Sequence, residues 1–154
     1  MARKVREQRL EPWVDFFGLC LQESDDEGVP VRWPEERDMG GGFLIAREGR
    51  IDLESAGHTH QAVMTVEVWD GEPPAEVPGE WEEQAEAELF SRSGELVVWA
   101  VTMGPDEEVV ELGQPGVRWR VRVRCGGRAR VAELAPLDVV EGIEVYLVQL
   151  WPCD

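Results

Sequence analysis

The 154-residue chain has two histidines, and they are separated by one residue in His58-Thr59-His60. On an extended chain their side chains point to the same side, so they could supply two ligands of a metal site. A single His-x-His pair with no third ligand at metal-site spacing more often belongs to an ordinary strand entry. We therefore favour a structural role, and a metal-dependent enzyme built around these histidines stays an alternative.

The other chemistry-bearing residue types show no catalytic pattern. The sequence has no Gly-x-Ser-x-Gly elbow, no His-Glu-x-x-His pair and no glycine-rich phosphate loop before a helix, and Gly40-Gly41-Gly42 indicates a flexible loop. Carboxylates are so numerous that a catalytic pair could always be proposed, which makes such a proposal uninformative. The sequence therefore predicts a non-catalytic protein without a cofactor or metal.

Acidic residues dominate the charge and are concentrated in the middle of the chain. The sequence has 32 Asp and Glu against 15 Lys and Arg, a net charge of -17, and residues 70–111 alone contain thirteen acids and one arginine. Such a field repels nucleic acid and anionic lipid, but it attracts and steers a basic protein. The residues expected to contact this partner are Asp70, Glu72, Glu76, Glu80, Trp81, Glu82, Glu83 and, in another loop, Trp33. A surface that only keeps the protein soluble is the open alternative.

Arginines alternate with apolar residues between Val117 and Cys125. Because successive side chains on a strand point to opposite faces, this strand has one apolar face and one basic face. The basic face, which we call the arginine ladder, consists of Arg118, Arg120, Arg122 and Arg124. It could bind an acidic or phosphate-bearing ligand. With so many carboxylates in the chain, we favour internal cross-strand pairs with residues such as Glu67, Glu86 and Glu88.

Alternating apolar and polar residues, bounded by Gly, Pro and acidic turns, recur along the chain and predict strands. The predicted strands cover residues 13–21, 43–47, 50–54, 62–69, 95–103, 107–112, 117–125 and 142–151. Many short strands with turn signals between them are typical of a sandwich or barrel. We predict an all-β, antiparallel, jelly-roll-like sandwich that forms a single domain over residues 1–154, with at most one short helix.

Two segments are less regular. Residues 80–90 contain strong helix formers but also alternate, and we favour a helical turn near Trp81 followed by a strand to Phe90 over a full helix. Residues 24–42 form the longest stretch without a period, which predicts an irregular surface loop with Trp33 exposed. Exposed tryptophans could also hold a glycan or metabolite, so a small-molecule-binding sandwich is an alternative function.

The composition and the N-terminal residues indicate a protein of the cytoplasm. No stretch approaches the ~20 apolar residues of a membrane span, and the basic start of the chain lacks the apolar run of a signal peptide. Cys20, Cys125 and Cys153 are far apart, which predicts reduced thiols, the first two in the core and the third exposed. We expect a monomer or a weak homo-oligomer, and a self-assembling scaffold with paired strand edges is a further alternative.

The order of these strand and turn patterns resembles a known family. One matching run is Val-Glu-Val-Trp-Asp-Gly-Glu-Pro-Pro at 66–74, and the others are residues 14–19, 81, 88–90, 94–98, 112, 115–125 and 144–152. Their layout is similar to bacterial proteins distantly like the competence protein ComJ, also called Nin. The resemblance implies a protein that binds and inhibits a DNA-entry nuclease, although it assigns no functional residue and leaves the loop 24–42 unmatched. We therefore expect an acidic protein-binding domain, an inhibitor or immunity-type partner of a basic nuclease or toxin.

Overall fold

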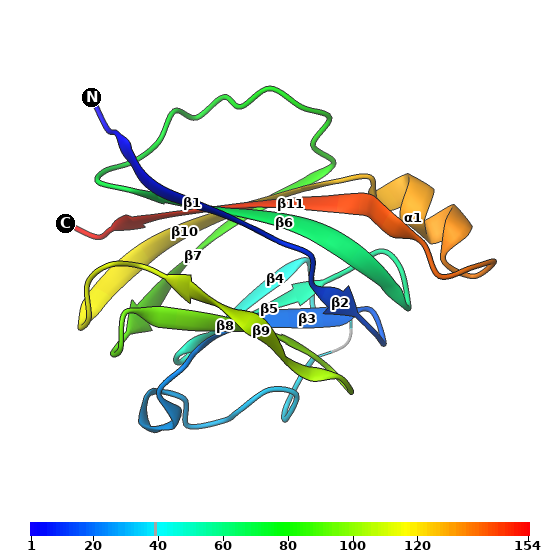
Figure 1. The fold of residues 1–154 in the computed structure, drawn as a ribbon, viewed down its shortest axis with the longest axis horizontal. Helices are drawn as coiled ribbons and strands as arrows, with labels where there is room; N and C mark the ends of the chain where they lie inside the picture. The colour runs from blue at the N-terminus through cyan, green and yellow to red at the C-terminus, as the bar shows by residue number, and fades with distance from the viewer. Residues whose placement is uncertain (39) are drawn as a thin grey trace.

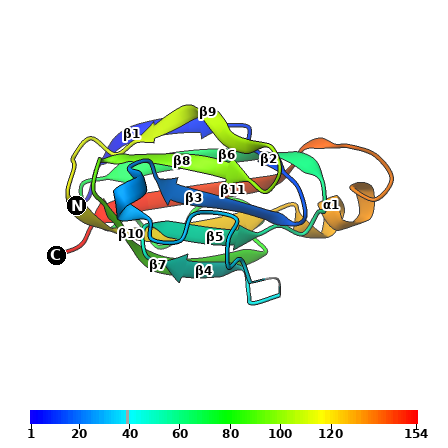
Figure 2. The ribbon, with the colours of Figure 1, turned by 90° about the horizontal axis from the view of Figure 1, so that it is seen from below.

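Two β-sheets pack face to face in the computed structural model, which describes residues 1–38 and 40–154 (Figure 1 and Figure 2). The strands are β1 (Lys4–Leu10), β2 (Trp13–Val14), β3 (Gly18–Glu23), β4 (Leu44–Arg47), β5 (Arg50–Glu54), β6 (His60–Trp69), β7 (Glu83–Ser91), β8 (Glu95–Ala100), β9 (Gly104–Glu111), β10 (Val117–Gly126) and β11 (Glu141–Pro152). The first sheet has the order β1-β6-β11-β10-β7 with β2 beside β6, and the second has the order β4-β5-β3-β8-β9. The pairs are antiparallel, except that β11 runs parallel to β6. The predicted all-β sandwich is confirmed.

The N-terminal part of the chain differs from the prediction. The single strand predicted over residues 13–21 is split into β2 and β3, which belong to different sheets. Between them, Phe16 and Phe17 have φ values of 51° and 60°, so the backbone turns sharply and crosses to the other layer. Asp15 fixes this turn by accepting a hydrogen bond from the Val101 N–H at 2.7 Å. The sequence pattern does not predict β1, because its residues are mostly charged, and this strand forms by pairing with β6.

The helical turn expected near Trp81 is wrong, whereas the strand expected to follow it is confirmed as β7. The Glu82 N–H donates to the Cys125 carbonyl at 2.8 Å, so the chain is already extended and paired beside β10. Among the described residues, the helices are a 3-10 turn, η1 (Asp26–Gly28), and one α-helix, α1 (Arg128–Leu134). Gly127 precedes α1 with a φ of 73°, and a Cβ at this position would lie 1.9 Å from a backbone oxygen. None of these described helices is long and apolar enough to cross a membrane.

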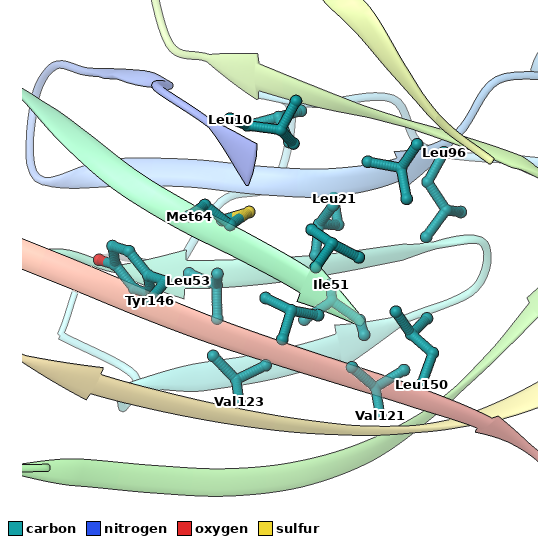
Figure 3. Close-up of a cluster of buried hydrophobic side chains, with 14 of the residues drawn as sticks. Leu10, Leu21, Ile51, Leu53, Met64, Leu96, Val121, Val123, Tyr146 and Leu150 are labelled. Carbon is teal, nitrogen blue, oxygen red and sulfur yellow. The ribbon is translucent and has the colours of Figure 1, made fainter. Parts of the chain in front are cut away.

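The core lies between the two sheets and consists of the inward-facing side chains of both. The apolar face predicted for β10 is buried, with Trp119, Val121 and Val123 each at most 1% exposed. Figure 3 shows these layers meeting, with labelled side chains at Leu10, Leu21, Ile51, Leu53, Met64, Leu96, Val121, Val123, Tyr146 and Leu150. The expected burial of Cys20 and Cys125 is confirmed, and Cys153 is half-buried. Alternation therefore located the core face of the sheet correctly.

A buried carboxylate on β3 joins the two sheets at one end of the sandwich. Glu23 is 1% exposed and accepts four hydrogen bonds. Two come from the hydroxyls of Ser91 and Ser93, at 3.1 and 2.6 Å, and two come from the backbone N–H groups of Ser24 and Ser93, at 3.1 and 2.8 Å. Because Ser91 ends β7 in the other sheet, this carboxylate links the layers through polar contacts.

We predict that Glu23→Gln destabilises the fold, because an amide brings two N–H donors to a position where four donors already converge. The free energy of unfolding should fall by about 2–3 kcal/mol, the cost of leaving buried polar groups unsatisfied. Chemical denaturation measures this loss. Glu95→Gln on the adjoining β8 is the matched control, since Glu95 is exposed and should change stability by less than about 0.5 kcal/mol. Equal losses in the two variants would contradict the linking role.

Candidate protein-interaction face

Residues 70–82 connect β6 to β7 and cross the outer face of the first sheet. The two strands belong to one sheet, but β11 and β10 separate them, so the connection has to pass over both. Figure 1 shows it as the green loop that arches above the sheet. We call this segment the acidic strap. It contains five of the residues predicted to contact a partner through a carboxylate, namely Asp70, Glu72, Glu76, Glu80 and Glu82.

Two residues of the arginine ladder hold the acidic strap on the sheet. Arg122 is 4% exposed and donates to the Glu72 carboxylate at 2.9 Å and to the Pro73 carbonyl at 3.5 Å. Arg124 is 2% exposed and donates to the Ala75 carbonyl. Ladder and strap therefore neutralise each other, and the strap buries guanidinium groups that would otherwise face water.

The remaining bonds of the ladder go to neighbouring strands. Arg122 donates to Glu86 at 2.9 Å, and this bond lowers the pKa of the Glu86 carboxyl. Arg120 lies 3.5 Å from Glu86 and 3.8 Å from Glu88. The further ladder contacts are Arg124 to Gln84 at 3.1 Å, Arg124 to Gln149 at 2.9 Å, and the Arg118 guanidinium 5.8 Å from the ring centre of Phe90. The internal pairing with carboxylates that the sequence favoured is present at Arg120 and Arg122, whereas Arg124 bonds two glutamines and a backbone carbonyl, so these three do not form an open basic face.

Glu82, at the end of the acidic strap, has a structural partner. Its carboxylate accepts hydrogen bonds from the backbone N–H groups of Arg128 at 2.8 Å and Ala129 at 3.0 Å, in the first turn of α1. These N–H groups have no partner within a helix, and the bond from Ala129 contributes most to lowering the pKa of Glu82. Gly127 stands at the N-cap position of this helix and has no side chain that could cap it, so Glu82 provides the cap instead.

The other predicted contact residues divide between bound and free side chains. Asp70 accepts a hydrogen bond from the Arg3 N–H at 2.7 Å, and half-buried Trp81 donates through its indole to the Val77 carbonyl at 3.2 Å. The carboxylates of Glu76, Glu80 and Glu83, along the acidic strap and at the start of β7, are exposed. These exposed groups keep the outer edge of the sheet strongly negative.

A hollow of about 310 Å³ lies where the acidic strap meets β7 and the end of β11. Its lining includes four carboxylate residues from three separate segments, Glu72, Glu86, Glu88 and Asp154, and one base, Arg120. Buried Arg122 pairs with Glu72 and Glu86, so two bases stand against these four carboxylates. Because the carboxylates still outnumber the bases, the hollow suits the guanidinium or ammonium group of another protein. The residues predicted to contact a partner included Glu72 but not Glu86 or Glu88. Their expected pairing with the arginine ladder was the sequence feature that could have placed them on this face.

Trp33 is not part of this face, and its expected exposure is wrong. The loop 24–42 lies against the second sheet, on the far side of the sandwich, and residue 39 of it lies outside the described residues (Figure 1). Trp33 is 4% exposed, and its backbone N–H donates to Gln22 at 2.9 Å. The Arg50 guanidinium lies 5.6 Å from the ring centre and pairs with Asp52 at 2.6 and 2.8 Å. This tryptophan fastens the loop to the sheet, which removes it as a platform for a glycan.

The two histidines diverge in the structure. His58 is exposed, and its ring centre lies 5.0 and 5.1 Å from those of Phe16 and Phe17. His60 is fully buried, with its Nε2 atom 2.8 Å from the Ser55 hydroxyl. The shared side expected for His58 and His60 is therefore wrong, because the chain turns at Gly57 and Thr59 before β6 begins.

A buried Ser–His–Glu network surrounds His60, and the sequence analysis missed it. Glu144 accepts hydrogen bonds from the hydroxyls of Ser55 and Tyr146, both at 2.7 Å, and from the Ala56 N–H at 2.9 Å. The Ser–His contact resembles a nucleophile with its base, but the carboxyl group bonds the serine and not the second histidine nitrogen. Burial lowers the pKa of His60, and all three groups are at most 2% exposed. The network satisfies a buried carboxyl group and is closed to substrate.

Comparisons with known proteins agree with this fold. The chain matches no family model and no curated protein sequence. It is similar to the crystal structure of ComJ, inhibitor of the DNA degrading activity of NucA, from Bacillus subtilis, with a TM-score of 0.62, 12% identity and 99% of each chain covered. It is also similar to the structure of crocagin biosynthetic gene J, with a TM-score of 0.61 and 17% identity over 97% of this chain and 100% of the other. The fold is shared over nearly the whole chain, and the distant resemblance to ComJ is supported.

We predict that Arg122→Leu loosens the acidic strap, because it leaves the carboxylates of Glu72 and Glu86 without their shared partner. The free energy of unfolding should fall by about 2 kcal/mol, and amide hydrogen exchange should accelerate across residues 72–79. Arg118→Leu is the control, since Arg118 is exposed and, among the described residues, its side chain bonds neither the strap nor a carboxylate. Unchanged exchange in Arg122→Leu would show that the strap is held by other contacts.

A second prediction concerns the cap on α1. Glu82→Gln should lower stability at pH 7 by roughly 0.5 kcal/mol, because a neutral amide interacts more weakly with the helix N-terminus. The pKa of Glu82 is lowered from its ordinary value of 4.5 in the folded protein. Its stabilising contribution is therefore complete above the ordinary value and is lost as the pH falls through the folded-state pKa. Urea denaturation at pH 7 and at about pH 3 measures the free energy of unfolding, and Glu83→Gln is the neighbouring control. If Glu82→Gln lowers this free energy equally at both pH values, the charge of Glu82 is not the cause.

Proposed function

We propose that this protein is a non-catalytic, acidic binding domain whose acidic strap and adjoining hollow recognise a basic protein. The observation that carries the proposal is the convergence of Glu72, Glu86 and Glu88 in one hollow beside the exposed Glu76 and Glu80. The partner would present arginine or lysine side chains to this face. The strap is fixed to the sheet by buried bonds, so the carboxylates are held in place before the partner arrives, which reduces the entropic cost of binding.

A nuclease is the partner class that fits this chemistry best. A nuclease must bind a phosphate backbone, so its substrate groove is basic, and an acidic surface of another protein can cover that groove. The similar fold of ComJ, an inhibitor of the DNA degrading activity of NucA, supports the same class. Inhibition by coverage requires no catalytic group, in keeping with a Ser–His pair that is sealed in the interior. The free cysteines support a cytoplasmic site of action.

The test combines the purified protein with a nuclease encoded beside its gene and measures DNA cleavage and the association rate at several salt concentrations. We expect inhibition, with an association rate that falls about tenfold or more as salt rises, since steering between charged surfaces is screened. Absence of a complex at low salt would contradict the proposal.

Charge reversals locate the surface. The double variant Glu76→Lys with Glu88→Lys should slow association by about tenfold, because both side chains lie on the proposed face. The control is Glu35→Lys with Glu48→Lys, two exposed residues beside the second sheet that change the net charge by the same amount. If both pairs slow association equally, net charge and not the acidic strap governs binding.

A further inference from the structure

At the edge of the sandwich opposite β7 and β4, a side chain joins the two sheets. The amide of Gln8 on β1 donates to the Val109 carbonyl at 2.9 Å and accepts from the Glu111 N–H at 2.9 Å. These are the two bonds that a neighbouring strand would make with β9. Figure 2 shows β1 and β9 side by side along this edge. The two sheets are therefore held together at this point of their edges.

Beyond Gln8 the edges separate, and a groove of about 200 Å³ opens between the β1–β2 link and the start of β9. Its apolar lining includes Trp13, Met103 and Pro105. Met103 is 67% exposed, so most of its apolar side chain is accessible to a molecule that enters the groove. The Asp15 carboxylate accepts hydrogen bonds from backbone N–H groups in the turn before Met103, so the groove is preformed.

The rim of this groove is acidic. Glu11 lies at one side, and Asp106 and Glu107 lie at the other. An adjoining hollow adds Glu108, and its one base, Arg9, already lies 3.7 Å from Glu11. The rim therefore has three carboxylates, Glu11, Asp106 and Glu107, against the single arginine beside Glu11. An apolar groove with such an acidic border is complementary to an apolar side chain flanked by positive charges.

We propose that this groove binds a basic segment of a partner protein, with one apolar side chain inserted over Trp13 and Met103 and its arginine or lysine neighbours facing Glu11 and Glu107. The groove and the acidic hollow lie at opposite edges of the first sheet, since the groove adjoins the end of β1 and the hollow adjoins β7, and these are its two outer strands. The groove is therefore a second binding surface, and its occupation does not depend on the nuclease-inhibitor function proposed above.

Methionine methyl groups report on this groove directly. With ¹³C-methyl-methionine labelling, Met103 is the reporter, and Met64, which is fully buried in the core, is the internal control. The probe is the peptide acetyl-Arg-Leu-Arg-amide, and the comparison peptides are acetyl-Arg-Gly-Arg-amide and acetyl-Glu-Leu-Glu-amide. We expect a saturable shift of the Met103 methyl signal with Arg-Leu-Arg at roughly millimolar affinity, at least fivefold weaker binding of the other two peptides, and an unchanged Met64 signal. No saturable shift of Met103, or equal shifts with all three peptides, would overturn the proposal.

Charge reversal separates this groove from the acidic strap. Glu107→Lys should weaken Arg-Leu-Arg binding at least fivefold, whereas the matched Glu76→Lys on the strap should leave it within twofold. Both residues are exposed, so neither variant is expected to unfold the protein, and the Met64 signal verifies that the core is intact. Equal weakening in the two variants would place the peptide elsewhere and overturn the groove assignment. Because the nuclease experiment uses Glu76 and Glu88, a failure of one proposal does not imply failure of the other.

Discussion

Arg122 is almost completely withdrawn from water, and the arrangement of the outer sheet face depends on the carboxylates that surround it. A buried guanidinium without partners is strongly destabilising, so the acidic strap has to lie where Glu72 can reach the ladder. The same pairing fixes Glu86 on β7, and the Arg122 guanidinium lies 4.9 Å from the ring centre of Trp151 on β11. One constraint, the neutralisation of a buried charge on the outer face of the sheet, thereby sets the course of thirteen connecting residues and the position of the acidic hollow.

Buried charged groups with several bonding partners also occur on the other face of the sandwich and inside it. On the second sheet, buried Arg50 pairs with Asp52, and the loop 24–42 covers the pair with Trp33. Within the sandwich, Glu23 and Glu144 each collect hydroxyl and backbone donors from both sheets or their connections. These charged groups can be buried because each has several hydrogen-bond partners. A buried network with missing hydrogen bonds would lower the free energy of unfolding by several kcal/mol. A highly charged chain can in this way form a compact core without placing every charge at the surface.

Local pattern predicted a large part of this structure. The alternation at 117–125 identified both faces of β10, since one face is entirely apolar, and the abundance of carboxylates correctly favoured internal partners for Arg120 and Arg122. Features that depend on distant residues were missed or wrong. Trp33 is buried because its backbone bonds Gln22 and its ring packs beside Arg50, both on the second sheet. No property of residues 24–42 predicts these contacts. Ser55 and Glu144 meet across most of the chain, and the crossing at Phe16 uses backbone angles that aromatic residues seldom adopt.

The late position of β11 in the chain has a consequence for synthesis on the ribosome. β11 is the central strand of the first sheet, yet it is formed by residues 141–152, after all its neighbours have been translated. Until these residues leave the exit tunnel, β6 and β10 have open edges, the state in which nascent chains associate wrongly. The carboxylates of residues 70–111 are already present at that stage, and their mutual repulsion between chains opposes such association. The acidic middle of the sequence therefore supplies charge repulsion between chains in which β11 has not yet completed the sheet.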